Sequence, residues 1–167
     1  MISIEKLTSE YQVKEIGEED VPAAYRLFLD NPEYFQYCPP EPSEDTVRGD
    51  MRAVPSGKLP FDKHYVGYFD EDRLCAVLDL IERYPDKQTA FIGFFMLRSK
   101  LQNKGLGTKL IKEITDYLSS LGYKHIRLGY VLGDKRAEHF WKKNGFEPTG
   151  HIAHLELYDI VMAQKEL

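Results

Sequence analysis

Three segments that alternate apolar and polar residues follow one another in the middle of the chain, with only short turns between them. They run from His64 to Phe69, from Leu74 to Arg83 and from Thr89 to Leu97. Alternation with a period of two is typical of strands, and turns of this length join antiparallel neighbours. The sequence therefore predicts an antiparallel meander, which excludes a Rossmann fold because no helices separate these strands.

The rest of the chain alternates helical and extended patterns. Apolar residues at helical spacing predict a long helix that Gly122 ends. Before the meander we expect a strand, a helix that follows an acidic turn, and a short helix that Ser43 caps. After the long helix we expect a strand, a helix and a final strand pair. In chain order these elements cover 11–16, 23–29, 44–51, 105–121, 125–132, 134–143 and 146 to the C-terminus.

The composition is that of an ordinary soluble globular chain. With 167 residues, 43% of them hydrophobic and 29% charged, residues 1–167 are expected to form one domain. No apolar stretch approaches a membrane span, and the charged N-terminus has no apolar signal core, so we expect a cytoplasmic protein without a membrane partner. The net charge of -5 gives no basic footprint for nucleic acid.

The cysteines and histidines carry no metal-ligand spacing. Cys38 and Cys75 lie far apart and outside any paired pattern, so we expect two free thiols and no metal.

The turn before the long helix has the chemistry of an anion site. It comprises Gln102, Asn103, Lys104, Gly105, Leu106, Gly107 and Thr108. The first amides of a helix lack helical acceptors, and two glycines let a ligand approach the backbone, so this turn is predicted to hold a phosphate group. The order Gly107-Thr108-Lys109 reverses that of a P-loop. By itself the Gly-x-Gly motif fits an ordinary strand-to-helix turn equally well.

Two blocks of residues together resemble the GNAT-type N-acetyltransferases. The first is Gln102-x-x-Gly105-x-Gly107, and the second is Asp134-x-x-Ala137-x-x-Phe140-Trp141-x-x-x-Gly145-Phe146. The resemblance implies an α/β (α+β) fold with a mixed, mostly antiparallel, V-shaped sheet of about seven strands and about four helices. It also implies transfer of an acetyl group from acetyl-CoA, the acyl donor, to a primary amine of a small molecule or peptide in a ternary complex.

The same resemblance implies roles for individual residues. The backbone amide of Phe95 would face the thioester oxygen, and the strand around Leu97 would pair with the pantetheine arm. The turn from Gln102 to Thr108 would hold the pyrophosphate. Further donor contacts would come from the second block, at Asp134, Phe140 and Trp141.

The proton-transfer residues of the family are not where the resemblance would place them. Trp141 stands at the position of the family's tyrosine acid, and an indole cannot supply a proton at neutral pH. Tyr130 is the substitute acid that we expect, although an aromatic residue in a strand often only packs.

A general base must also be found, because Phe91 stands where some relatives carry a glutamate. Asp79 and Glu82 on the neighbouring strand have opposite parity, so only one of them faces the cleft. A hairpin loop of two or four residues would pair Glu82 with Phe91, whereas a loop of three or five would place Asp79 and Ile81 on that face. We favour Asp79, which interrupts an apolar run, although a structural acid would fit there equally well.

Other functions remain open at this stage. The chain could be a non-catalytic acyl-CoA-binding or regulatory module, or a small nucleotide- or phosphate-binding domain. The acceptor is expected at the aromatic segment that contains Tyr34, Phe35 and Tyr37, together with the acid of the neighbouring strand, although aromatic residues near prolines fit ordinary loop packing equally well. A homodimer is left open as well.

Overall fold

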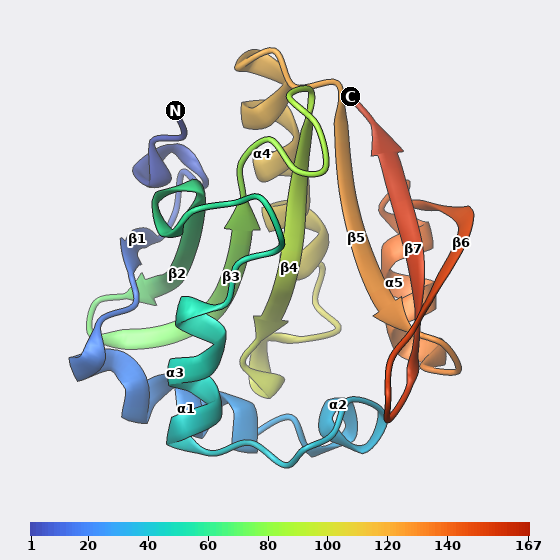
Figure 1. The fold of residues 1–167 in the computed structure, drawn as a ribbon. Coiled ribbons are helices and arrows are strands. Elements are labelled where there is room, and N and C mark those ends of the chain that lie inside the picture. The colour runs from blue at the N-terminus through green and yellow to red at the C-terminus, as the bar shows by residue number, and fades with distance from the viewer.

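The computed structural model describes residues 1–167 and contains one mixed sheet of seven strands. The strand order is β1-β2-β3-β4-β5-β7-β6, and β4–β5 is the one parallel pair (Figure 1). This confirms the predicted mixed, mostly antiparallel sheet. The strands are β1 (Gln12–Glu15), β2 (Lys63–Asp70), β3 (Arg73–Ile81), β4 (Thr89–Leu97), β5 (His125–Val131), β6 (Glu147–His154) and β7 (Asp159–Glu166).

Five α-helices accompany the sheet, one more than expected. The additional helix lies in the aromatic segment after Asn31, where Pro32 occupies a first-turn position that suits its missing N–H. Ser43 caps the third helix, as predicted, by accepting a hydrogen bond from the Thr46 amide at 3.0 Å. No helix combines the length and apolar character that crossing a membrane requires. The helices are α1 (Val21–Leu29), α2 (Pro32–Tyr37), α3 (Glu44–Arg52), α4 (Leu106–Ser120) and α5 (Lys135–Lys143).

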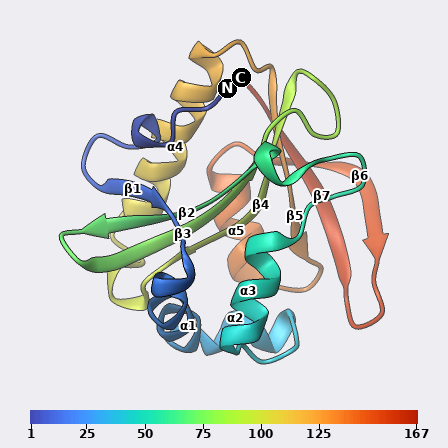
Figure 2. The same cartoon turned by 60° about the vertical axis from the view of Figure 1, so that its left-hand side comes forward.

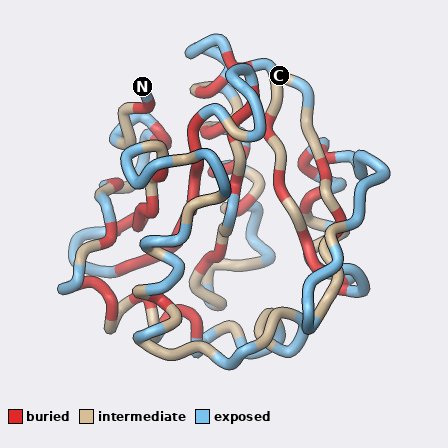
Figure 3. The backbone as a smooth tube through the Cα atoms, viewed as in Figure 1, coloured by how far each residue is buried: buried red, intermediate tan, exposed pale blue.

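Two hydrophobic cores cover the two faces of the sheet. Buried side chains of α4 and α5 pack on one face with alternate residues of β3 and β4, such as Leu78 and Ile92. Buried side chains of α1 and α3 pack on the other face with residues such as Val77 and Met96. Figure 2 shows α1 and α3 below β2 and β3, on the side away from α4, and Figure 3 shows buried segments along the central strands.

The sheet opens between β4 and β5. These strands pair only from Thr89–His125 to Ile92–Leu128, and from Gly93 onward they diverge. Figure 1 shows the gap between the carboxyl ends of the two strands, with α2 and the β6–β7 turn below it. The V-shaped sheet that the family resemblance implied is therefore present.

The register of β3 and β4 decides between the two carboxylates. Ile81 pairs with Phe91, so Ile81 and Asp79 share its face. A bulge then follows, because Leu80 pairs with Ile92 while Asp79 pairs with Phe94. Gly93 is the extra residue of this bulge, and it lies where β4 leaves β5.

Candidate functional site

The divergence of β4 and β5 leaves a cavity of about 180 Å³ that both faces of the sheet help to line. Asp134, Ala137 and Trp141 reach it from the α5 side, whereas Tyr34 and Tyr158 reach it from the α2 side. Residues from both sides of the sheet therefore meet at this cavity, between the diverging strands. We refer to it as the cleft.

The amino end of α4 is open and lacks a side-chain cap. Gly105 precedes the helix in a left-handed conformation, with φ of +83°, and a Cβ atom there would meet nothing within 4 Å. The first helical bond runs from the Lys109 amide to the Gly105 carbonyl at 3.0 Å. The amides of Leu106, Gly107 and Thr108 therefore have no acceptor within the protein, which is the arrangement that binds anions.

The second glycine of the turn serves packing rather than ligand approach. A Cβ atom on Gly107 would lie 3.1 Å from Cε2 of Phe140 and 3.4 Å from Cδ1 of Leu97. Gly107 is buried, whereas Asn103, Lys104 and Gly105 are exposed. The two glycines of the motif thus have different roles. Gly105 allows the left-handed turn and leaves the surface above it open, whereas Gly107 allows α4 to pack closely against α5.

Gln102 ties the turn to its surroundings. Its Nε2 donates to Oδ1 of Asn31 at 2.6 Å and to the Leu97 carbonyl at 2.9 Å, and its Oε1 accepts from Arg136 at 3.3 Å. Asn31 Nδ2 also donates to the Leu97 carbonyl, at 3.1 Å. The end of β4, the end of α1 and the turn are held together by these bonds, and the Leu97 carbonyl is fully occupied.

Aromatic side chains form the α5 side of the cleft. The rings of Phe95 and Phe140 are nearly parallel, with centroids 6.2 Å apart. The ring centroid of Trp141 lies 4.8 Å from that of Phe140 and 5.3 Å from that of Phe146. Trp141 is thus a packing residue that also lines the cleft. At the start of α5, the Asp134 carboxylate caps the helix by accepting from the Ala137 amide at 3.2 Å.

Tyr130 lines the cleft from β5 and is 6% exposed. Burial raises the pKa of its phenol, so the hydroxyl group stays protonated at neutral pH and remains a proton donor.

Asp79 faces the α1 and α3 side of the sheet, where it is paired with a buried lysine. Lys63 Nζ lies 2.7 Å from Oδ2 of Asp79, and the two side chains are 4% and 12% exposed. Burial still raises the pKa of Asp79 in spite of the lysine. A Cβ atom at Gly93 would lie 2.5 Å from the same carboxylate oxygen, so the glycine makes room for the pair.

Glu82 lies elsewhere. Its carboxylate accepts from the Ile2 amide at 3.0 Å and bonds to Nε2 of His64 at 2.8 Å, and it lies 3.9 Å from the N-terminal ammonium. Burial raises the pKa of Glu82, but the bonds from His64 and Ile2 outweigh it and leave the pKa lowered. The structure therefore does not bring Glu82 to the cleft.

One residue on the α2 side of the cleft, Tyr158, carried no sequence signal. Cys38 Sγ donates to the Tyr158 hydroxyl at 3.3 Å, and this bond, with burial, raises the pKa of Tyr158 to about 12. Tyr158 is 120 positions from Cys38, so no local pattern could link them. Of the aromatic residues expected there, Tyr34 lines the cleft, Phe35 packs on Phe28, and Tyr37 is exposed.

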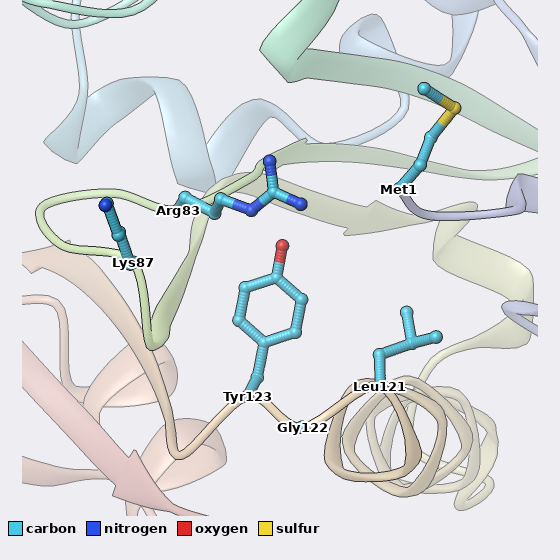
Figure 4. Close-up of a pocket in the computed structure, with 6 residues that line it drawn as sticks. All are labelled: Met1, Arg83, Lys87, Leu121, Gly122 and Tyr123. Atoms are coloured by element: carbon cyan, nitrogen blue, oxygen red, sulfur yellow. The ribbon is translucent and has the colours of Figure 1, made fainter.

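A smaller hollow of about 120 Å³ lies between the β3–β4 loop and the carboxyl end of α4. Figure 4 shows Arg83 and Lys87 on one side of it and Tyr123 on the other. It shares no residue with the cleft. Elsewhere, no three His, Cys, Asp or Glu side chains gather into a metal-binding group, and both cysteines are free.

Comparisons with known proteins agree on one family. The sequence model of the acetyltransferase (GNAT) family matches residues 10–146. The fold is similar to that of an acetyltransferase from Thermus thermophilus, with a TM-score of 0.75 and 18% identity over 95% of this chain and 98% of that one.

Two further solved structures share the fold. The ribosomal-protein-S18-alanine N-acetyltransferase from Escherichia coli has a TM-score of 0.66 and 15% identity, and the match covers 93% of this chain and 92% of that one. The paia N-acetyltransferase from Thermoplasma acidophilum, solved with coenzyme A, has a TM-score of 0.67 and 15% identity over 95% and 100% of the two chains. The chain therefore belongs to the GNAT family and is an N-acetyltransferase of that family.

Proposed function

We propose that this protein transfers an acetyl group from acetyl-CoA to a primary amine of a small molecule or peptide, by direct attack within a ternary complex and with residues 1–167 acting as one domain. The observation that carries the proposal is the uncapped amino end of α4, which packs through Gly107 on Phe140, the ring next to Phe95 of the cleft. This arrangement supports a donor held at α4 whose acyl end lies between the diverging strands.

The residues on the donor side suit a pyrophosphate. The free amides of Leu106, Gly107 and Thr108 and the positive end of the helix dipole favour an anion, and the exposed Lys104 adds a positive charge. Asn103, with φ of +60°, shapes the turn next to Gly105.

The strand β4 is proposed to bind the donor through its backbone. Beyond Ile92 its edge toward β5 has no strand partner, so backbone groups between Gly93 and Leu97 are free for a ligand. We assign the oxyanion contact to the amide of Phe95, and one such donor typically lowers the barrier by ~3 kcal/mol. The occupied carbonyl of Leu97 means that strand-like pairing with the pantetheine arm uses the other free groups of this segment.

Tyr130 is proposed to return a proton to the departing thiolate, because the indole of Trp141 cannot. Replacing Tyr130 by phenylalanine is expected to lower kcat about 100-fold with little change in the affinity for acetyl-CoA. Tyr123→Phe is the matched control, because Tyr123 is a tyrosine of similar burial that lines the separate hollow and not the cleft. An equal loss of kcat in both variants would remove the assignment to Tyr130.

The function is tested by measuring thiol release from acetyl-CoA with a panel of amines. The panel should include peptide amino termini, because one structural neighbour is named for the alanine of ribosomal protein S18. Acetyl-CoA binding without thiol release on any amine would instead support a non-catalytic binding module.

The donor site is tested separately with Gly105→Glu, which places an anion where the phosphates are proposed to bind and should abolish acetyl-CoA binding. Gly57→Glu is the matched control, because Gly57 also has φ of +83° and nothing within 4 Å of a Cβ position. The control should lose similar stability yet bind acetyl-CoA. If Gly105→Glu also binds, the assigned turn is wrong.

A further inference from the structure

A cluster of charged and polar side chains, which we call the recess, lies near α3 on the face of the sheet that α1 and α3 cover, which we call the acceptor side. It is formed by the ion pair of Lys63 and Asp79, by Tyr65 on β2, and by Asp50 on α3. With one positive and two negative charges, the recess carries a net charge of -1 when Asp50 is ionised. This charge would be neutralised by one ammonium group.

The recess also has unused hydrogen-bonding capacity. The Tyr65 hydroxyl and Oδ1 of Asp79 are buried without any partner, and Tyr65 is only 3% exposed. Tyr65 pairs with Asp79 across β2 and β3, and it shares a hydrophobic core with Val47, which lies about one helical turn before Asp50 on α3. Buried polar groups are nearly always bonded, so two such atoms on paired residues indicate a site that a ligand completes.

The recess adjoins the cleft at Gly93. Gly93 is exposed and lines the cleft, and a Cβ atom there would lie 2.5 Å from Oδ2 of Asp79. On the other side, the charge of Asp50 reaches Tyr34 and Tyr158, which both line the cleft. A group bound against Asp79 at Gly93 therefore lies two residues along β4 from Phe95, and both of these residues line the cleft where the thioester is proposed to lie.

We propose that the acceptor binds as an alkylammonium ion between Asp50 and Asp79 at Gly93, and that Asp50 removes its proton. This inference rests on the proposed function. In the reaction, Asp50 takes one ammonium proton, and the amine nitrogen forms a bond to the acetyl carbon. The carbon–sulfur bond breaks with its electron pair on sulfur, and the second nitrogen proton ends on the thiol. The products are the N-acetyl amide, the free thiol and protonated Asp50, which then loses its proton to water.

Asp50 suits this role better than Asp79 does. Protonation of Asp79 would leave the buried Lys63 without its counter-ion, whereas Asp50 makes no ion pair and keeps exposed surface although its carboxyl is partly desolvated. Desolvation by the groups packed around its carboxyl raises the pKa of Asp50 to about 6, with Lys63 lowering it and Asp79 raising it further. A base of this strength is ionised at neutral pH and accepts a proton readily. The titratable or charged groups that act on Asp50, or on which it acts, are Lys63, Asp79, Tyr34, Tyr65 and Tyr158.

The first test compares Asp50→Asn with Asp45→Asn, an exposed acid on the same helix that pairs with Arg48. For Asp50→Asn, kcat/KM for the amine should fall about 100-fold and no longer rise with pH through about 6. The Kd of acetyl-CoA should stay within about twofold of the wild-type value, as should every constant of the control variant. An unchanged kcat/KM with the same rise near that pH would overturn the proposal.

The second test needs no turnover. Calorimetric titration of the CoA-saturated protein with n-butylamine, and with the neutral n-butanol, asks whether the recess selects an ammonium ion. The wild type should bind the amine and not the alcohol, Asp50→Asn should lose that preference, and Tyr65→Phe should weaken amine binding while the protein stays folded. Equal binding of both probes, or of neither, overturns the inference. A wild type that selects the amine but acetylates none in the panel contradicts the proposed function alone.

Discussion

Breaking the ion pair of Lys63 and Asp79 should strongly lower the free energy of unfolding, and Lys63→Met tests this. Methionine has nearly the length of the lysine side chain and fills its place without a charge. The substitution leaves the Asp79 carboxylate 12% exposed, without a counter-ion and with Oδ1 already unpartnered. Stranding a buried charge in this way typically costs about 3–5 kcal/mol.

That loss is large for a protein of this size. Natural domains have a free energy of unfolding of about 5–15 kcal/mol. At about 2–4 °C per kcal/mol for a chain of this length, the melting temperature should fall by roughly 6–20 °C. The double variant Lys63→Met/Asp79→Leu removes both charges and should lie within about 1 kcal/mol of wild type or above it, because the burial cost of both ions disappears.

The pH dependence of the free energy of unfolding gives an independent check on the role of the Asp79 charge. Burial sets the folded pKa of Asp79 above its unfolded value, so its ionisation opposes folding as pH rises from about 4 through the folded pKa. Lys63 lowers that pKa, so its loss moves the folded value further up. The deficit of Lys63→Met should therefore be greater at pH 7 than at pH 4.

Urea unfolding followed by tryptophan fluorescence measures these differences, since Trp141 is buried in the core. A Lys63→Met variant whose free energy of unfolding lies within about 1 kcal/mol of wild type at pH 7 would refute the reasoning, because a buried carboxylate without a counter-ion should destabilise the fold by more than that. A double variant as unstable as the single one would show that packing, rather than charge, is responsible.

Three further predictions concern other parts of the molecule. The pKa of His64 is raised, chiefly by its bond to Glu15. Its contribution to the stability of the fold is therefore complete below the unfolded pKa of about 6.5 and is lost as pH rises through the folded pKa. The melting temperature of His64→Gln should not show this decrease with rising pH. Gly107→Val should lower the free energy of unfolding, measured in urea, by about 1–3 kcal/mol, because its Cβ would lie 3.1 Å from an α5 ring. Gly49→Ala, in open space on α3, should raise the free energy of unfolding by about 0.5–1 kcal/mol. Asp134→Ala should cost about 1 kcal/mol through loss of the α5 cap, and Asp134→Asn should retain both the melting temperature and the KM for acetyl-CoA.

Much of the fold could be predicted because its elements carry strong periodic patterns. The strand predicted at 89–97 is β4 as observed, and the helix predicted at 134–143 begins at Lys135, with Asp134 as its cap. The short helix α2 was missed because its six residues contain too little periodicity, and the proline that ends one helix also begins the next.

The chemistry of the acceptor side could not be predicted because it depends on register and on contacts distant in sequence. The bulge at Gly93 sets which residue of β4 faces Asp79, and no rule for hairpin loops gives a bulge beyond the loop. The partner of Asp79 is Lys63, 16 positions away on another strand. Glu82 was a reasonable alternative from parity, but its bonds to Ile2 and His64 could be found only from the folded chain.

The divergence of β4 and β5 separates two kinds of recognition. On the proposed function, the donor is held mainly by the main chain of β4 and the amides of α4, whereas the acceptor meets side chains of α2, α3 and the β6–β7 turn. Main-chain contacts survive most substitutions, while side-chain contacts change with each one. A lineage that keeps this sheet can therefore exchange one acceptor for another by mutating three peripheral segments, and the requirement for its donor remains intact throughout.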